Sequence, residues 1–287
     1  MNSSDWEILS VLAKEKNMTK ASERLFIAQP SLSYRLRKVE EEFGAPLFYR
    51  MPGGIVLTPE GETVLRYTQK LQALYIELQN ELQNKNGQPY GTLRIGVSSA
   101  FANSDFPQLL KDFGKAYPNI NIHLRTSRSS GVDQALQEGE ISVAVTRGEP
   151  VWQEEKYLLR QEPVCLAAKE PIRLRDLPNK PQILIPYSGI HAQSIRWWHQ
   201  HFSVRPHVGM ELDNMETGIQ MVLHNLGWMI LPSMMLRPDM KLFQQPLYWS
   251  DGSAFIRKTW LCCRKEALKS PVAAAFVTFL LEREGCK

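Results

Sequence analysis

ASERLFIAQPSLSYRLRKVEEEFGAPLFYRMPGGIVLT, residues 21–58, contains two helical patterns separated by a short break and followed by a turn. The second pattern begins at Gln29-Pro30 and ends at Gly44. Its apolar residues recur at helical spacing at Leu32, Leu36, Val39 and Phe43. Proline is tolerated in the first turn of a helix, and glycine is common just past a helix end. Pro52-Gly53-Gly54 predicts a turn between two short extended stretches.

Two more helices are predicted upstream of this stretch. Positions 8, 9, 11 and 12 are apolar and form one face of a helix whose N-cap is Ser4 or Asp5. Thr19 then precedes a short helix that contains Ala21 and Leu25. A short helix, a tight turn and a second helix form a unit that reads DNA, because the start of the second helix enters the major groove.

The second helix of this unit begins with side chains that suit base edges and phosphates. These candidate DNA-binding residues are Gln29, Pro30, Ser31, Ser33, Tyr34, Arg35, Arg37 and Lys38. The acids Glu40, Glu41 and Glu42 come only later, so positive charge lies where a duplex would bind. From spacing alone, an ordinary amphipathic helix with solvated charges stays open as an alternative.

A long helix is predicted from Pro59 to about Gln83. Its apolar residues follow a 3.5-residue repeat at Val64, Tyr67, Leu71, Leu74 and Leu78, with Leu82 after them. Such a narrow stripe is typical of a helix that pairs with another helix. The alternative is a helix that packs only on its own domain. Residues 84–90, NKNGQPY, are polar and broken by glycine and proline, so we expect a domain boundary there.

Strand and helix patterns alternate beyond residue 91. Strands are predicted at 93–97, 120–124, 141–145, 183–185, 208–212 and 228–231, and helices at 106–117, 132–137, 195–201, 215–224 and 271–284. This alternation is typical of parallel α/β sheets, here in two halves without sequence repeat. The extended stretch 156–168 is expected to carry the chain from one half to the other, and 260–264 to carry it back.

Residues 21–58 resemble the DNA-binding domain of LysR-type transcriptional regulators. The residues that carry the resemblance are Ala21, Leu25, Gln29, Pro30, Ser31, Leu32, Ser33, Glu40, Gly44, Leu47, Phe48, Arg50, Leu57, Thr58 and Gly61. The resemblance implies a recognition helix with Gln29, Ser31, Ser33, Tyr34 and Arg35, a wing around 51–54, and dimerisation through the helix after Thr58. It also implies a C-terminal domain similar to periplasmic binding proteins, with an effector cleft between two α/β subdomains.

The chain departs from the family pattern at several positions. Ser22 stands where the family often has a second alanine, and Val39 where it often has leucine. The wing has less arginine than is common in the family, which gives Arg50 more of the expected phosphate contact. Ser142 replaces an acidic residue that is common before the third strand of the effector domain, so no effector role is carried over to that position.

The expected architecture is therefore a two-domain α+β and α/β protein. It has a winged helix-turn-helix domain at 1–58, a linker and dimerisation helix with a hinge at 59–90, and an effector-binding domain at 91–287. Within the last, subdomain I is expected at about 91–161 and 265–287, and subdomain II at about 162–264. The expected partners are double-stranded DNA, a small-molecule effector and a second copy of the chain; pairing of dimers into tetramers is left open.

Polar residues at the carboxyl ends of the predicted strands are the candidates for effector binding, because ligands of open α/β sheets bind there. They are Ser98, Ser99, Ser129, Ser130, Thr146, Arg147, His191 and Asn214. Hydroxyl groups and nearby helix N-termini suit a small, polar, anionic effector. The alternative for each serine is a helix cap or turn former, and for Arg147 a solvated side chain near Glu149.

Composition and motifs weigh against other classes of function. The 287 residues are 43% hydrophobic and 22% charged, with a net charge of +4, which indicates a folded, mildly basic protein. Ser98, Cys165 and His191 could be assembled into a nucleophilic set, but no nucleophile elbow, phosphate loop or paired-histidine motif is present, so we predict no enzyme and no cofactor. A pure solute-binding protein would need export, and the polar N-terminus does not resemble a signal peptide.

The cysteines and the hydropathy pattern indicate a cytoplasmic protein. No apolar run approaches the ~20 residues that span a bilayer, so no membrane partner is expected. Cys165 and Cys286 stand alone, and Cys262-Cys263 are adjacent, so no metal-ligand spacing is present. The adjacent pair is expected to be buried in a strand; a redox role is the alternative.

Overall fold

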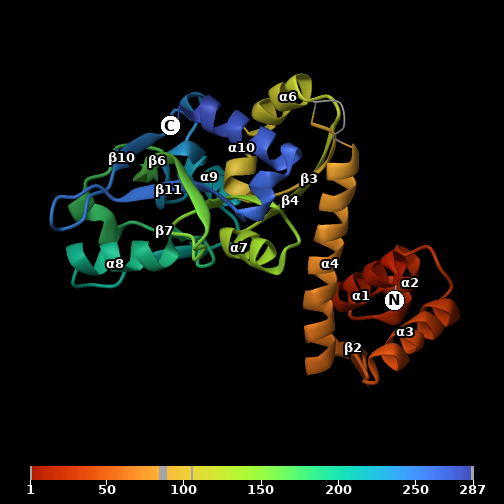
Figure 1. Ribbon diagram of the computed structural model, residues 1–287. Coiled ribbons are helices and arrows are strands. Elements are labelled where there is room, and N and C mark those ends of the chain that lie inside the picture. The colour runs from red at the N-terminus through yellow and green to blue at the C-terminus, as the bar shows by residue number, and fades with distance from the viewer. Residues whose placement is uncertain (1, 84–88, 105, 286–287) are drawn as a thin grey trace.

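A small N-terminal unit, one long helix and a larger C-terminal α/β body make up the computed structural model, which describes residues 2–83, 89–104 and 106–285 (Figure 1). The N-terminal unit consists of α1 (Ser3–Glu15), α2 (Met18–Arg24), α3 (Gln29–Phe43) and the hairpin of β1 (Phe48–Met51) and β2 (Gly54–Leu57). The helix α4 (Pro59–Gln83) follows. The predicted helix-turn-helix and wing are therefore confirmed. Residues 84–88, on which most of the predicted domain boundary falls, lie outside the described residues.

The starts of α1 and α2 differ from the prediction. Asn2, and not Ser4 or Asp5, caps α1: its side chain accepts from the Asp5 N–H, and the Asp5 carboxylate accepts from the Asn2 N–H. This reciprocal arrangement satisfies two backbone donors that a helix start leaves open. Asn17 caps α2 through its side-chain oxygen, which accepts from the Thr19 and Lys20 N–H groups, with Thr19 inside the first turn. Asparagine is as good a cap as serine or aspartate, so the sequence alone did not decide between neighbouring candidates.

Family residues of the N-terminal unit have identifiable structural roles. Glu40 accepts hydrogen bonds from the backbone N–H groups of Leu47 and Phe48, which joins α3 to β1. The Thr58 hydroxyl donates to the Pro46 carbonyl and accepts from the Gly61 N–H, so it caps α4. A Cβ atom on Gly61 would lie 2.0 Å from the Leu47 carbonyl oxygen, so only glycine fits. These contacts fix the wing and α4 against α3.

The helix α4 exposes most of the predicted repeat. Five of its apolar residues, which we call the apolar stripe, are exposed: Tyr67, Leu71, Leu74, Leu78 and Leu82. Val64, the first residue of the repeat, instead packs against the core of the N-terminal unit. At 1.5 Å per residue the helix is about 38 Å long, and its second half contacts the C-terminal body.

The C-terminal body is built on a seven-stranded mixed sheet with β9 (Met229–Pro232) paired to β6 (Glu155–Ala168). The path across it is β10 (Phe243–Pro246), β6, β11 (Ile256–Cys263), β5 (Val143–Arg147), β3 (Gly91–Ser98) and β4 (Ile120–Ser127). The prediction of parallel sheets was therefore only partly right. β3 pairs in parallel with β4 and β5, but β11, β9 and β10 all join antiparallel. The reason is that β6 and β11 are long strands that run between the two halves in opposite directions.

The second half contains a separate parallel pair, β7 (Gln182–Leu184) and β8 (Val208–Glu211). The helices of the body are α5 (Ser99–Ala102), α6 (Phe106–Ala116), α7 (Ser129–Glu138), α8 (His191–His201), α9 (Met215–Leu223) and α10 (Pro271–Glu284). Short 3-10 turns cover Leu174–Asn179, Ser233–Met235, Pro238–Met240 and Glu266–Lys269. α7 and α8 start earlier than predicted, because their first turns are polar and carry no apolar repeat. None of the described helices is both long and apolar enough to cross a bilayer.

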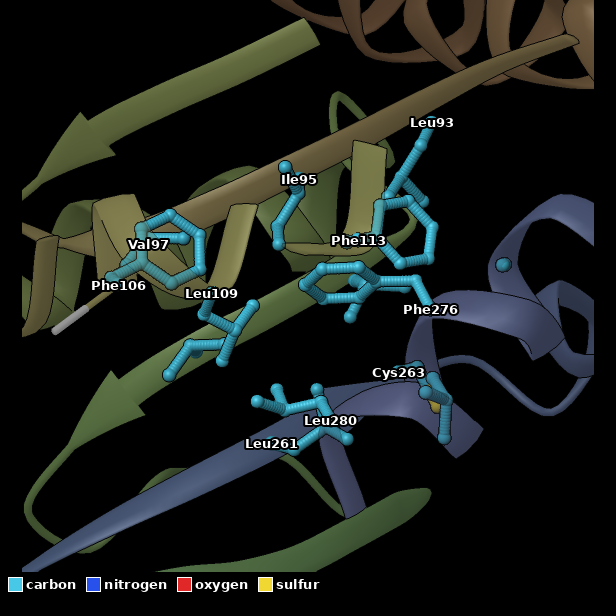
Figure 2. Packing of buried hydrophobic residues seen from close by; sticks show 14 of the residues in the cluster. Leu93, Ile95, Val97, Phe106, Leu109, Phe113, Leu261, Cys263, Phe276 and Leu280 are labelled. Carbon is cyan, nitrogen blue, oxygen red and sulfur yellow. The ribbon is translucent and has the colours of Figure 1, made fainter. Parts of the chain in front are cut away.

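The two largest hydrophobic clusters among the described residues of the body lie at opposite ends of the crossing strands. The first packs α6 and α10 against β3 and β5, and Figure 2 shows Phe113 and Phe276 meeting between the strand residues and α10, with ring centroids 5.1 Å apart. The second is centred on Trp197, Trp198 and Trp228. β6 leaves the first core and enters the second, and β11 returns, starting earlier than the predicted 260–264. The exact subdomain boundaries stay a prediction.

Candidate DNA-binding face and effector cleft

The exposed face of α3 contains most of the side chains that the sequence indicated. Its exposed members are Gln29, Pro30, Ser31, Tyr34, Arg37 and Lys38. Leu32, Leu36 and Val39 are buried on the opposite face, which fixes the rotation of the helix. Arg50 on β1 is exposed as well, while Ser33 is half-buried. The polar and basic residues are thus free to meet a duplex.

Arg35 differs from its neighbours on α3. Its guanidinium lies 2.6 Å from the Asp5 carboxylate and 3.4 Å from the Asn2 side-chain oxygen, both at the start of α1. The Arg35 side chain is therefore held against α1 and is not free in solvent. The sequence could not show this contact, because it depends on the position of α1.

The turn before α3 has an unusual residue. Phe26 adopts the left-handed conformation, with φ of 54°, and its side chain is 95% exposed. Left-handed backbone is uncommon for a residue with a side chain, and here it lets the chain reverse sharply between α2 and α3. The turn therefore places the start of α3 at the surface of the N-terminal unit.

A cleft of about 700 Å³ lies between the two halves of the body. One wall comes from the end of β3, the start of α7 and the end of β5; the other comes from the segment after β7 and the start of α9. Of the predicted effector residues, six line it: Ser98, Ser99, Ser129, Ser130, Arg147 and Asn214. Thr146 and His191 do not. Neighbouring strand residues project to opposite faces, so Thr146 projects away from the face of β5 that carries Arg147. His191 is the first residue of α8 and directly follows Ile190, which does line the cleft.

Several of the polar groups in the cleft already have structural partners. The Ser129 hydroxyl accepts from the Arg147 N–H at 3.1 Å, and Asn214 caps α9 by accepting from the Thr217 N–H. Ser99 donates to the Ser127 carbonyl oxygen at 3.2 Å. Ser98 is different, because its buried hydroxyl has no hydrogen-bond partner among the described residues.

Arg147 is buried and paired. Its guanidinium forms an ion pair with Glu162, and the second Glu162 oxygen accepts from the Met234 N–H at 2.7 Å. Burial lowers the pKa of Arg147, and the Glu162 charge opposes this shift. The positive charge of Arg147 is therefore matched within the protein.

Arg257 on β11 is a cleft residue that the sequence analysis missed. It is 7% exposed, and its terminal nitrogens donate to the carbonyl oxygens of Gly189 at 2.8 Å and Arg147 at 2.7 Å. No carboxylate of the described residues lies within ion-pair distance of it. Burial, helped by the nearby charge of Arg147, lowers the Arg257 pKa to about 10. A signal was present in the sequence, since an arginine at an inward position of an apolar strand is rarely buried without a role.

Glycines shape the space around Arg257. A Cβ atom on Gly148 would lie 2.8 Å from its Nη1 atom, and one on Gly189 would lie 2.5 Å from its Nη2 atom. Gly148 also adopts a φ of 110°, which favours glycine. These two positions therefore hold the guanidinium in the floor of the cleft.

Two contacts join the walls of the cleft. The Arg128 guanidinium lies 5.3 Å from the centre of the Tyr187 ring, and the Asn103 amide donates to Glu216 at 2.8 Å.

Asp133 also lines the cleft, with one carboxylate oxygen buried and without a hydrogen-bond partner among the described residues. Burial raises the pKa of Asp133, and the Thr146 hydroxyl opposes the shift. Asp133 was missed because it lies inside α7, away from the strand ends considered, whereas Arg128 directly follows β4 and was passed over in favour of the serines after it.

The cysteines do not form a reactive site. Cys165, Cys262 and Cys263 are buried and free, and burial raises their pKa values to about 11, 12 and 12. Thiolate is the reactive form of cysteine, so these thiols are poor nucleophiles. Cys286 lies outside the described residues. Within the described part of the chain no group of His, Cys, Asp and Glu side chains could hold a metal ion.

Comparison with known proteins identifies both parts of the chain. Residues 3–62 match the family model for the bacterial regulatory helix-turn-helix protein of the lysR family, and residues 86–285 match the model for the LysR substrate binding domain. The chain is 34% identical over 281 residues to YraN of Bacillus subtilis strain 168, described as an uncharacterized HTH-type transcriptional regulator. The match covers 98% of this chain and 97% of YraN.

Solved structures show the same fold. The LysR family transcriptional regulator CbnR has a TM-score of 0.69 at 19% identity, and the match covers 100% of both chains. Full-length CbnR complexed with its target DNA has a TM-score of 0.66 to this chain, and the match covers 99% of this chain and 100% of CbnR. With both family models and a close full-length relative in agreement, the chain belongs to the LysR family of transcriptional regulators, with a DNA-binding helix-turn-helix and an effector-binding domain, and it is not an enzyme.

Proposed function

We propose that this regulator binds promoter DNA as an oligomer, through the exposed face of α3, and responds to a small anionic metabolite in the cleft. The observation that carries the anion is Arg257. A buried guanidinium without a carboxylate partner is costly, because the interior solvates charge poorly. An anionic group of a ligand would supply the missing partner.

Glu162 and Glu149 favour the charged form of Arg257 through space, but no described carboxylate forms an ion pair with it. Glu149 pairs with Lys258 at 3.0 Å, Glu216 accepts from Asn103, and Asp213 accepts from the Asn214 amide at 2.7 Å. The deep part of the cleft therefore contains one buried cation without a direct carboxylate partner among the described residues, Arg257.

Ligand binding would act through closure of the cleft. Arg128 and Tyr187 face each other across it, and β6 and β11 are the strands that connect the two halves. A ligand shifts such an equilibrium only if it binds the closed form better than the open form. Contacts to both walls, for example to Ser129 on one and Tyr187 on the other, together with Arg257 in the floor, would provide that difference.

DNA contact is assigned to the exposed side chains of α3. Gln29, Ser31 and Tyr34 suit base edges, while Arg37, Lys38 and Arg50 suit phosphates. Arg35 is assigned a positioning role, because its contact with Asp5 holds α3 against α1. A structure of CbnR, which shares this fold, complexed with its target DNA supports DNA binding by this chain.

Oligomer formation is assigned to α4. The apolar stripe exposes Leu71, Leu74 and Leu78 by 48%, 60% and 50%, although such side chains are normally covered. A second copy of α4 would cover them, and a two-fold dimer would present two recognition helices to an inverted repeat.

The test of the proposed effector is a calorimetric screen of small carboxylates, phosphates, amines and neutral metabolites against the full-length protein. An anion should bind, and Arg257→Gln should weaken it strongly. The matched control is Arg237→Gln, which removes an exposed arginine that pairs with Asp239 and is not among the residues lining the cleft. A neutral or cationic ligand, or equal affinity of the Arg257→Gln variant, would contradict the proposal.

A further inference from the structure

A second cavity, distinct from the cleft, lies where α4 meets the first half of the body. It has a volume of about 260 Å³, and we call it the junction pocket. One wall is α4, with Lys70, Ile76 and Asn80; the other comes from β3 and the segment before β5, with Arg94 and Ser142. The family assignment does not use this pocket, and the proposed function uses only one of its lining residues, Leu74 of the apolar stripe.

The charges of the junction pocket are unbalanced. Three cationic side chains line it, from Lys70, Arg94 and Arg264, against one carboxylate, Glu266, which is exposed. The Arg264 guanidinium donates to the carbonyl oxygens of Leu136 and Gln137, but its buried Nε atom has no partner among the described residues. The pocket therefore has an excess of positive charge.

Arg94 is the cation with the fewest contacts. It is half-buried, and burial lowers its pKa, yet its side chain makes no hydrogen bond or ion pair with any described residue. Removing a charge from water without a partner costs free energy. An anion in the pocket would recover part of that cost.

Ser142 leaves room beside Arg94. The register that pairs Ile95 with Val143 places Arg94 opposite Ser142, and the Ser142 N–H donates to the Arg94 carbonyl oxygen at 2.9 Å. Neighbouring residues in register on paired strands project their side chains to the same face. The short, uncharged serine side chain cannot form an ion pair with the Arg94 guanidinium, so a negatively charged partner for Arg94 would have to come from a ligand.

We propose that the junction pocket binds a small carboxylate with a short apolar tail. The carboxylate would meet Arg94 and Lys70, and the tail would lie against Ile76, Ile141 and Val272. The volume is just below the ~300–1,000 Å³ of typical ligand sites, so the ligand is smaller than a usual drug-like molecule.

Binding there would fix the orientation of α4 on the body. The junction is already held by Asn80, which bonds the Thr92 carbonyl oxygen and N–H at 3.2 and 3.1 Å, and by Gln69, which donates to Glu140 at 3.0 Å. A ligand between these contacts touches both walls and therefore binds only when α4 is docked. It provides a second input to the DNA-binding unit that does not pass through the cleft.

The test uses fluorine NMR of 6,6,6-trifluorohexanoate with the full-length protein. The signal should broaden and shift on binding, and Arg94→Gln should weaken binding about tenfold or more. Ser142→Asp should do the same, because its carboxylate would pair with Arg94 in place of the ligand. Arg94→Lys, which keeps the charge, should retain part of the affinity. Arg257→Gln in the cleft and the exposed Lys115→Gln should leave binding unchanged.

Several results would overturn the proposal. They are a lack of binding by the wild-type protein, equal binding by trifluorohexanol, or unchanged affinity in both Arg94→Gln and Ser142→Asp. Loss of binding in Arg257→Gln would also overturn it, since the probe would then occupy the cleft. Unfolding midpoints of all variants, measured alongside, must stay near that of the wild-type protein; Arg94→Lys provides the comparison if Arg94→Gln is destabilised.

Discussion

The DNA-binding face and the effector cleft both contain basic side chains, but they present these charges in opposite ways. Arg37, Lys38 and Arg50 are exposed, whereas Arg147 and Arg257 are 6% and 7% exposed and held by hydrogen bonds. Exposed charge acts over a distance and is screened by salt. A buried charge is screened little by salt, but only a group that enters the cleft can reach it. The first surface is therefore suited to a long polyanion, and the second to one small anion of matching shape.

The two regions also depend differently on a second copy of the chain. The cleft is complete within one chain, since all of its lining comes from residues 98–257. The DNA-binding face of one chain has a single recognition helix. One chain can therefore contact only one half-site of an inverted repeat. Separating the copies should therefore affect the two regions unequally.

Leu71→Glu gives the largest expected effect. A glutamate in the middle of the apolar stripe would be buried without a partner in a dimer, so we expect monomers and an operator affinity that falls by roughly 100-fold or more. Anion binding in the cleft should be unchanged. Light scattering, operator binding and calorimetry measure the three quantities.

The control for this variant is Gln72→Glu, which adds the same charge at the next position, outside the apolar stripe. It should stay dimeric and bind DNA normally. If Leu71→Glu is dimeric with full operator affinity, α4 does not form the dimer. If both variants lose cleft binding, the cleft depends on the dimer and the contrast between the regions fails.

Arg257→Gln should give the next largest effect. The ligand anion would lose its charged partner, which costs about 2–3 kcal/mol, or roughly 30- to 150-fold in affinity. Operator binding without effector should stay within about twofold of the wild type, because Arg257 lies far from α3 along the fold. Calorimetry with the identified anion and gel-shift assays separate the two effects.

The buried position of Arg257 also predicts weak salt dependence for effector binding. Between about 50 and 200 mM salt, the effector affinity should change far less than the operator affinity, since buried pairs are poorly screened. A steep salt dependence of the effector would place its anionic group at the exposed rim and not at Arg257.

Lys38→Ala tests the exposed charge of the DNA-binding face, for which we expect a strong salt dependence. Loss of one phosphate contact should weaken binding to specific and random DNA alike and reduce the slope of log affinity against log salt by about 1. Lys111→Ala, an exposed lysine on α6, is the control and should leave the slope unchanged. Arg35→Ala should change the slope less than Lys38→Ala, because Arg35 contacts Asp5. If Arg35→Ala changed the slope as much as Lys38→Ala, Arg35 would be a phosphate contact and not a positioning residue.

The contrast between the regions also explains what the sequence could predict. In the DNA-binding unit the signals are local: Gln29-Pro30 starts α3, Gly44 ends it, and Pro59 starts α4, all as predicted. In the body, α-β alternation predicted the elements, but not that β9, β10 and β11 join antiparallel. Strand direction depends on which elements cross between the halves, and local periodicity carries no such information.

The cleft shows the same limit at the level of single residues. Serines after strands were found because strand ends can be read from sequence. Arg257 was not, because it reaches the Arg147 carbonyl across 110 residues of sequence. Likewise, the contact that holds Arg35 against α1 joins residues 30 positions apart. Functional side chains held by contacts between distant segments need the structure.

The smallest expected effects are those of Ser98→Ala and Ser129→Ala on effector affinity, and the two variants should differ. The Ser98 hydroxyl is buried, lines the cleft and has no partner among the described residues, whereas the Ser129 hydroxyl already accepts from the Arg147 N–H. A ligand oxygen can therefore take the Ser98 hydroxyl without breaking an existing bond. Ser98→Ala should lower effector affinity by about 1 kcal/mol, roughly fivefold, which is the usual net value of one hydrogen bond.

Ser129→Ala should act differently, because it removes the acceptor of a backbone N–H at the end of β5. We expect a lower unfolding midpoint and a smaller loss of effector affinity than in Ser98→Ala. Calorimetry and thermal unfolding of both variants give the two quantities. If Ser129→Ala loses more affinity at an unchanged midpoint, the ligand binds at the start of α7, and the helix N-terminus, not the floor formed by Ser98 and Arg257, holds the anion.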